Sequence, residues 1–163
     1  MMKKWKTWSL KDKRLRLFYD YVPLDHTLLV NQWALTDGGI IGRNKKGEVK
    51  EGYFSSLFFD GEKCYHLERV RLVCSSNNES EYSAVIDTMV AIVDHYNFDR
   101  INMPKGIVIY TDSELVINQI NNKWRVKAEN LINFYKAAHQ LSNEWRFKLT
   151  WVSGKIVKEV LGH

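Results

Sequence analysis

Two spacings of hydrophobic residues alternate along the chain, one typical of strands and one typical of helices. Mostly apolar runs at residues 28–35, 53–59, 63–73, 107–110 and 147–152 predict strands. Asp60 and Gly61 lie between the second and third runs and predict a β-hairpin turn. The run at 107–110 is continuously apolar, which predicts a central strand that is buried on both faces.

Between these runs, apolar residues recur every three or four positions. The stretch 77–92 predicts a helix with a buried stripe of Tyr82, Val85, Ile86, Met89 and Val93. Residues 113–124 predict a short helix, and residues 128–143 a longer one with an inner face of Leu131, Phe134, Tyr135, Ala138 and Leu141. Residues 153–163 lead into another helical segment. An antiparallel meander followed by strand–helix units predicts an α/β fold, in which helices pack on a mixed sheet.

Composition narrows the class of protein. Apolar residues make up 45% of the 163 positions and aromatic residues 13%, which is typical of a globular domain. No apolar run approaches the roughly 18 residues of a membrane span, and no apolar block follows the basic N-terminus, so we expect neither a membrane span nor a secretory signal. Cys64 and Cys74 form no metal-binding or disulfide pattern, and we expect reduced thiols in a cytoplasmic protein.

Positive charge is concentrated at the N-terminus. The formal net charge is +5, and residues 1–16 carry seven Lys or Arg with a single acid. Trp5 and Trp8 lie among these cations, so two interpretations stay open. The segment binds nucleic acid, with cations on phosphates and indole rings on bases, or it is a solvated, partly disordered tail. We take residues 1–27 as a basic extension, separated near Pro23 from a domain at 28–163.

Two Asp residues share a sequence context. Asp37 and Asp112 each follow a Thr at the expected C-terminal end of an apolar strand, and each precedes a small residue. Gly38 and Gly39 predict a turn after the first of these strands. Because ligand sites in α/β sheets favour the C-terminal ends of strands, the two carboxylates converge if the strands are neighbours.

Glu81 is the third candidate acid. It lies in the first turn of the expected helix, on the flank of the apolar stripe, with Asn77 or Asn78 as the N-cap. The helix dipole alone also explains an acid there. Three clustered carboxylates repel one another unless a cation compensates, and oxygen ligands without clustered His or Cys favour Mg²⁺ or Mn²⁺. Together the three acids predict metal-dependent phosphodiester chemistry.

Four short motifs resemble, in their order, the type 1 ribonuclease H (RNase HI) family of the ribonuclease H-like superfamily. They are TDGG at 36–39, SNNESEY at 76–82, YTDSELV at 110–116 and WVSG at 151–154. The resemblance implies a five-stranded mixed sheet whose first three strands are antiparallel, flanked by helices. It also implies endonucleolytic hydrolysis of the RNA strand of RNA–DNA hybrids with two Mg²⁺ ions, or with Mn²⁺.

The resemblance assigns roles to individual residues. Asp37 resembles the ligand shared by both ions, and Glu81 and Asp112 resemble ligands of the ion on the leaving-group side. Backbone at 38–41 is implied to approach RNA 2′-hydroxyls, which distinguish RNA from DNA. Ser76 resembles the hydroxyl that seats a DNA phosphate, and Asn77 and Asn78 resemble the two amides that touch the minor groove. The other candidate substrate-binding residues are Gly38, Gly39 and Ser113.

The chain departs from the family in several places. Glu114 stands where Gln is common, and Lys155 stands where a flexible-loop His is expected. No acid occupies the window of the fourth family carboxylate, and Glu159 is the nearest substitute. The gap between Trp124 and Ala128 leaves no room for the basic handle helix of some members. We therefore hypothesise that the basic N-terminal extension compensates in substrate binding.

These observations favour a ribonuclease H that acts on RNA–DNA hybrid through Asp37, Glu81 and Asp112. A non-catalytic or weakly active nucleic-acid-binding module of the same fold is the alternative from another class, favoured by the missing fourth acid. The ribonuclease H domain of a reverse transcriptase is a further alternative, although the initial Met and basic extension favour a free-standing protein. We expect a monomer.

Overall fold

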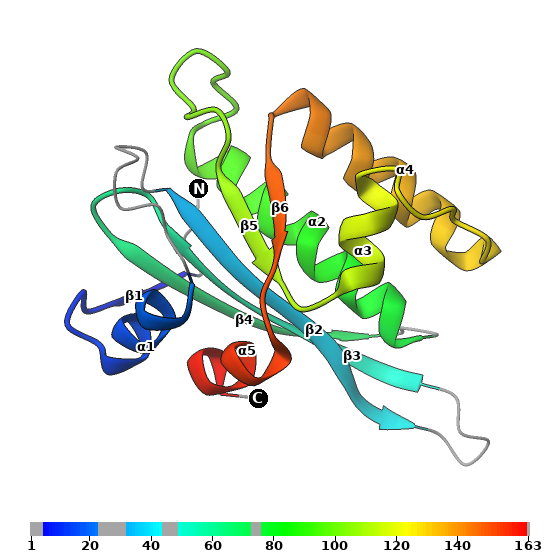
Figure 1. Cartoon of the computed structure of the whole chain (residues 1–163), viewed down its shortest axis with the longest axis horizontal. Helices are drawn as coiled ribbons and strands as arrows, with labels where there is room; N and C mark the ends of the chain where they lie inside the picture. The colour runs from blue at the N-terminus through cyan, green and yellow to red at the C-terminus, as the bar shows by residue number, and fades with distance from the viewer. Residues whose placement is uncertain (1–4, 23–31, 44–48, 73–75, 163) are drawn as a thin grey trace.

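A six-stranded mixed sheet organises the molecule, with strands in the order β1-β4-β3-β2-β5-β6 (Figure 1). The computed structural model describes residues 5–22, 32–43, 49–72 and 76–162. The strands are β1 (Lys6–Trp8), β2 (Trp33–Arg43), β3 (Val49–Phe59), β4 (Cys64–Leu72), β5 (Val108–Thr111) and β6 (Lys148–Trp151). The helices are α1 (Lys13–Tyr21), α2 (Asn77–His95), α3 (Glu114–Ile120), α4 (Glu129–Glu144) and α5 (Gly154–Leu161).

The sheet confirms the predicted fold class. Strands β2, β3 and β4 are antiparallel neighbours, and β5 pairs in parallel with both β2 and β6. Helices α2, α3 and α4 cover one face, while α1 and α5 lie against the other (Figure 1). The prediction of five strands was one short, because the three-residue β1 is too brief to show a periodicity in the sequence and adds itself to the edge of β4.

The predicted turn at 36–39 was wrong, because β2 runs straight through these residues to Arg43. The glycines serve close packing instead of a turn. A Cβ atom at position 38 would lie 2.3 Å from the backbone oxygen of Ser80, so only glycine lets β2 approach the first turns of α2 this closely. Asp37 consequently lies within a strand, and only Asp112 follows the end of one.

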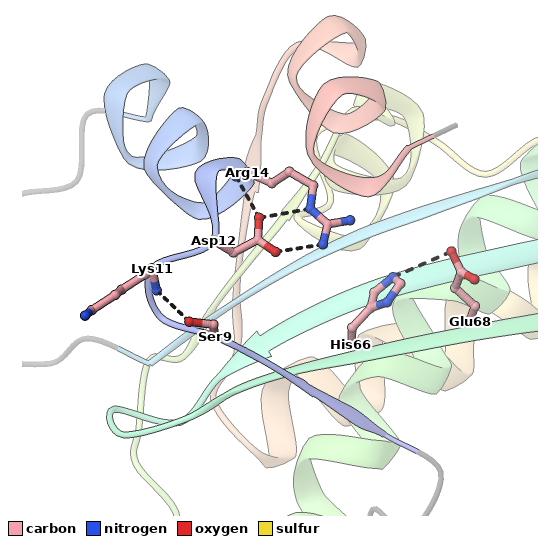
Figure 2. A network of polar contacts seen from close by, with 6 residues as sticks. All are labelled: Ser9, Lys11, Asp12, Arg14, His66 and Glu68. Atoms are coloured by element: carbon pink, nitrogen blue, oxygen red, sulfur yellow. Dashed lines mark hydrogen bonds and ion pairs between the residues drawn. The ribbon is translucent and has the colours of Figure 1, made fainter.

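The described part of the N-terminal segment is folded onto the domain. Trp8 is buried, its ring packs against His66 of β4 at a tilt of 47°, and the Arg14 guanidinium lies 3.6 Å from the centre of the indole ring. Asp12 caps α1 and holds Arg14 through two hydrogen bonds (Figure 2). Trp8 is therefore not free to stack on a base, and residues 5–22 are not a disordered tail. The expected boundary at residues 27 and 28 falls outside the described residues.

Helix α1 is anchored by apolar side chains. Leu15 and Phe18 are fully buried, and the ring of Phe18 packs against those of Trp33 and Tyr110 at centroid distances of 4.5 and 5.4 Å. Removing residues 1–20 would strip these side chains from the core. The hypothesis that basic residues here bind substrate is therefore better tested by replacing exposed cations singly than by truncation.

A closed network of three hydroxyl groups lies between β2, β3 and α2. Ser56 donates a hydrogen bond to Thr36 at 2.8 Å, and the Thr88 hydroxyl lies 2.6 Å from that of Ser56. Thr88 also approaches the Thr36 hydroxyl and the carbonyl of Ala84, at 3.1 and 2.7 Å. All three hydroxyl side chains are fully buried, and all have hydrogen-bond partners.

Two further expectations concern single features. The Asp60-Gly61 hairpin connects β3 and β4 as predicted, and Asp60 accepts hydrogen bonds from the backbone of Glu62 and Lys63. Cys64 is a buried free thiol, whereas Cys74 lies outside the described residues. None of the described helices combines the length and the apolar character that a membrane span requires.

Candidate active site

Asp37 is the most buried of the three candidate acids, with 9% of its surface exposed. It lies on β2, beside the glycine at position 38 that brings this strand against α2. The hydroxyl of Tyr53, from the neighbouring strand β3, donates a 3.3 Å hydrogen bond to Asp37 Oδ2. The Tyr53 ring fills the space above Gly39, where a Cβ atom would come within 2.5 Å of it. The second glycine therefore makes room for the ring that holds the first acid.

Glu81 lies in the first turns of α2 and is half-buried, as its place on the flank of the stripe predicted. Its Oε2 accepts a 2.8 Å hydrogen bond from the hydroxyl of Ser113, and its Oε1 accepts one of 3.3 Å from the side chain of Asn77. The N-cap of α2 is Ser76, whose Oγ accepts from the Glu79 amide, so the expectation of Asn77 or Asn78 was wrong. A hydroxyl one residue earlier satisfies the same free amides.

Asp112 follows β5 directly, and its neighbour Ser113 caps α3. The Asp112 Oδ1 atom is buried without a hydrogen-bond partner among the described residues. Gly154, the first residue of α5, lies so close that a Cβ there would be 3.0 Å from Asp112 Oδ2. The indole N–H of Trp151 donates to the Asp112 carbonyl at 3.2 Å, which fixes the backbone of this acid to β6.

The three carboxyl groups are close enough to influence one another. Burial, with the charges of Asp112 and Glu81, raises the pKa of Asp37 to about 7, while the hydrogen bond from Tyr53 opposes the rise. Burial also raises the pKa of Glu81, and the charge of Asp112 adds to that effect. The pKa of Asp112 is raised by burial and lowered by the charge of Lys158 on α5. Buried carboxylates of like charge favour any ligand that brings positive charge.

The residues fit a hard divalent cation in chemistry, although the described part of the chain forms no ready-made metal cage. Among the described residues, no three His, Cys, Asp or Glu side chains already stand in a metal-binding arrangement. The available donors are carboxylate oxygens from Asp37, Glu81 and Asp112, the ligand type preferred by Mg²⁺ and Mn²⁺. Buried Asp112 Oδ1 has no hydrogen-bond partner in the described part of the chain, and such an orphaned acceptor is what a bound cation would satisfy.

The candidate substrate-binding residues lie on β2 (Gly38 and Gly39), at the start of α2 and at the N-cap of α3. Ser76 and the exposed Asn77 begin α2, and Asn78 beside them is half-buried. The start of α4 lies next to them, because Asn130 donates to Glu79 Oε2 at 3.1 Å. Ser113 bonds Glu81 and is buried, so its side chain serves the acid in this structure.

Sequence reasoning missed Tyr53, Gly154 and Lys158. Each reaches the acids from an element whose placement depends on long-range pairing. The signal for Tyr53 was the strand register, since Gly39 pairs with it across β2 and β3 and leaves a gap that a ring can fill. Gly154 lies within the WVSG motif at 151–154, but the local pattern holds no comparable signal for Lys158. Lys155 and Glu159, singled out in the sequence, are both exposed on this helix.

Comparisons with known proteins agree with this geometry. Residues 60–160 match the model of the reverse transcriptase-like family. Similar solved structures include LC11-RNase H1 in complex with an RNA/DNA hybrid, with a TM-score of 0.61 and 19% identity over 76% of this chain and 86% of that one. RNase H1 from the halophilic archaeon Halobacterium salinarum has a TM-score of 0.58 and 20% identity, over 78% of this chain and 89% of that one.

A longer viral protein also contains the fold. The protease-reverse transcriptase of prototype foamy virus matches with a TM-score of 0.56 and 14% identity, over 81% of this chain and 18% of the viral one. At these identities the solved structures establish the shared fold. The family model covers more than half of the chain. The protein therefore belongs to the reverse transcriptase-like family, and its fold is that of ribonuclease H.

Proposed function

We propose that this protein hydrolyses the RNA strand of RNA–DNA hybrids endonucleolytically, with Asp37, Glu81 and Asp112 as its metal ligands. The observation that carries the proposal is the cluster of three buried or half-buried carboxyl groups with raised pKa values, one of them with an orphaned oxygen. Such a cluster is costly for a metal-free protein, and a divalent cation removes the cost.

The three acids would hold one or two Mg²⁺ or Mn²⁺ ions, which when bound lower the pKa of water and neutralise charge at the leaving oxygen. The chain's own groups set the orientation of these ligands. Tyr53 holds one oxygen of Asp37, and Ser113 and Asn77 hold the two oxygens of Glu81. Hydrogen-bonded ligands keep their rotamers, which lowers the cost of ordering them around an ion.

Substrate recognition would involve the surface beside the acids. Ser76, Asn77 and Asn78 are suited to phosphate and minor-groove contacts at the start of α2. A groove of about 610 Å³ lies next to the start of α4, with Lys123, Trp124, Arg125 and Lys136 in its lining. Cations around an exposed indole ring suit a nucleic-acid strand, since they neutralise phosphates and the ring stacks on a base.

Two alternatives share the fold. The first is a binding module without catalysis, which would recognise the hybrid and leave it intact. The second is the ribonuclease H domain of a reverse transcriptase, which the match to the foamy virus protein supports. The first alternative predicts affinity for hybrid without cleavage. The second predicts cleavage and differs from the main proposal only in the polypeptide to which the domain belongs.

The deciding experiment is a cleavage assay with end-labelled RNA annealed to DNA. RNA duplex and DNA duplex of the same sequence serve as substrate controls, and Mg²⁺, Mn²⁺ and EDTA as conditions. We expect metal-dependent cleavage of the RNA strand in the hybrid alone, lost in Asp112→Asn and retained in Glu62→Gln, which neutralises an exposed acid in the β3–β4 turn. Circular dichroism would confirm that Asp112→Asn is folded.

Two results would overturn the proposal. Wild-type protein that cleaves nothing with either metal, while binding the hybrid, would establish the non-catalytic module. Equal cleavage by wild type and Asp112→Asn would remove the acids from the mechanism.

A further inference from the structure

A second cavity lies on the opposite side of Asp112 from α2, where α1, β6 and α5 meet. Its volume is about 400 Å³, within the usual range of small-ligand sites. Tyr21 and Val22 line it from the end of α1, Thr150 and Trp151 from β6, and Ser153 and Ile156 from the start of α5. Helix α1, which forms this wall, lies outside residues 60–160, the range that matches the family model.

Two large aromatic side chains stand half-exposed at this cavity. Tyr21 is 53% exposed and Trp151 is 50% exposed, while Tyr110 and Val152 beneath them are buried. The cavity therefore has an apolar floor and aromatic walls that are open to solvent. Aromatic rings in such a place offer flat faces for stacking, and they lose little conformational freedom when a ligand binds.

The wall from α1 is held in place before any ligand arrives. Phe18, one turn before Tyr21 and Val22, is fully buried against Trp33 and Tyr110, and the Val22 amide donates to the Phe18 carbonyl at 3.0 Å. On the other wall, the Trp151 indole N–H is bonded to the Asp112 carbonyl. A preformed site avoids the ordering cost that a mobile segment would pay on binding.

The same hydrogen bond connects the cavity with the acid cluster. Trp151 bonds the backbone of Asp112 from the cavity side, and Gly154, next to the cavity residue Ser153, lies so close to the carboxylate that a Cβ there would be 3.0 Å from Asp112 Oδ2. A strand bound at the acids can therefore reach the cavity within a short length of chain. Among the described residues that line it there is no Lys, Arg, Asp or Glu, so this lining suits neither a phosphate group nor a cation.

We propose that this cavity binds an unpaired nucleobase of the substrate, stacked on Tyr21 and Trp151; the inference rests on the proposed function. The occupant is a base because it is flat, aromatic and uncharged, as the lining requires. It is unpaired because a base within a duplex has both faces stacked and cannot enter a pocket without leaving the helix. Hybrids with an overhanging or displaced nucleotide are therefore the preferred substrates.

The test measures the affinity for hybrids with and without one unpaired nucleotide. Fluorescence anisotropy would use the uncleaving variant Asp112→Asn with Mg²⁺, a blunt RNA–DNA hybrid, and four hybrids extended by one nucleotide at each RNA or DNA end. A matched set of four extended hybrids carries an abasic nucleotide in place of the added one. We expect at least one extended hybrid to bind about fivefold tighter or more than the blunt one, and its abasic form to lose that gain.

Variants of Tyr21 assign the gain to the cavity. We expect Tyr21→Ala to abolish the gain and to leave the affinity for blunt hybrid within twofold, while Tyr21→Phe, which keeps the ring, retains it. Tyr21 is the better target, because Trp151→Ala would also remove the bond to Asp112. A gain that is absent, that survives Tyr21→Ala, or that persists with the abasic probe would overturn the inference.

Cleavage of blunt hybrid by the wild-type protein, measured in parallel, separates the two proposals. Cleavage without an overhang effect refutes the base pocket alone. A Tyr21-dependent overhang effect without cleavage refutes the nuclease and retains the pocket as part of a binding module.

Discussion

Two clusters of polar side chains lie next to each other on β2 and α2, and they differ in whether their hydrogen-bonding groups are satisfied. Thr36, with Ser56 and Thr88, belongs to a closed network in which every hydroxyl is bonded. Asp37, the next residue, belongs to a group of carboxyl groups with raised pKa values, and one buried oxygen of this group has no partner among the described residues. The satisfied cluster serves folding, and the unsatisfied one carries a cost that points to function.

The largest expected effect comes from a substitution of Asp37, which should lower cleavage without lowering stability. Asp37→Asn removes a proposed metal ligand and one of the three clustered charges while it keeps the shape of the side chain. We expect cleavage to fall by about 10³-fold or more, with no loss of thermal stability. Single-turnover cleavage and thermal melts of the same preparation would measure both. Lower stability together with retained cleavage would reverse the assignment of the two clusters.

The pH dependence of stability sharpens the comparison in the metal-free protein. Because the folded pKa of Asp37, about 7, is above its unfolded value, the folded state holds a proton that the unfolded state releases. The free energy of unfolding should therefore fall as pH rises from about 4 to 7, by on the order of 2–4 kcal/mol from this residue, and then level off.

Urea denaturation in EDTA at several pH values, beside Asp37→Asn, would isolate this contribution. Glu81 and Asp112 shift in the same direction and remain in both proteins, so only the difference between the two curves belongs to Asp37. Parallel curves for wild type and variant would contradict the prediction.

The hydroxyl network should respond in the opposite way. Thr88→Val keeps the volume of the side chain and removes the hydroxyl that bonds Ser56, Thr36 and the Ala84 carbonyl. We expect a loss of about 1–2 kcal/mol in the free energy of unfolding, with cleavage within twofold of wild type. Thr88→Ser, which keeps the hydroxyl, is the matched control for urea denaturation and should retain the network. Cleavage lost at unchanged stability would tie this network to the active site.

The smallest expected effect concerns Tyr53, which lies beside the acids and donates a hydrogen bond to one of them, Asp37. Tyr53→Phe keeps the ring over Gly39 and removes the bond that favours charged Asp37. The pKa of Asp37 then rises further, so a cation competes with a more tightly held proton. We expect Mn²⁺ affinity by calorimetry to fall by less than tenfold at pH 6.5 and by less again at pH 8.5. Tighter binding at both pH values would mean that the hydroxyl competes with the ion.

The sequence was informative where local patterns determine structure. The Asp60-Gly61 turn, the stripe of α2 and the abrupt end of β5 at Asp112 follow from residue spacing, and the structure has all three. The turn expected at Gly38 and Gly39 was wrong because glycine has two uses. A local pattern does not distinguish a glycine that bends the chain from one that admits a neighbouring helix or ring.

Long-range pairing accounts for the other misses. Strand β1 has three residues, too few for a period, and it forms because the edge of β4 is available. Tyr53, Gly154 and Lys158 reach the acids only after the sheet has set its register and α5 has docked. The placement of the acids in metal-binding roles stays a prediction that the cleavage assay tests.

The close approach of β2 to α2 at Gly38 limits which residues can replace this glycine during evolution. Any other residue there would push the first turns of α2, and Glu81 with them, away from Asp37. Under the proposed function, selection on catalysis therefore acts on a backbone position that supplies no catalytic side chain. In a saturation-mutagenesis library, activity should tolerate almost no replacement at this position, whereas a descendant released from catalysis would be free to lose the glycine together with the acids.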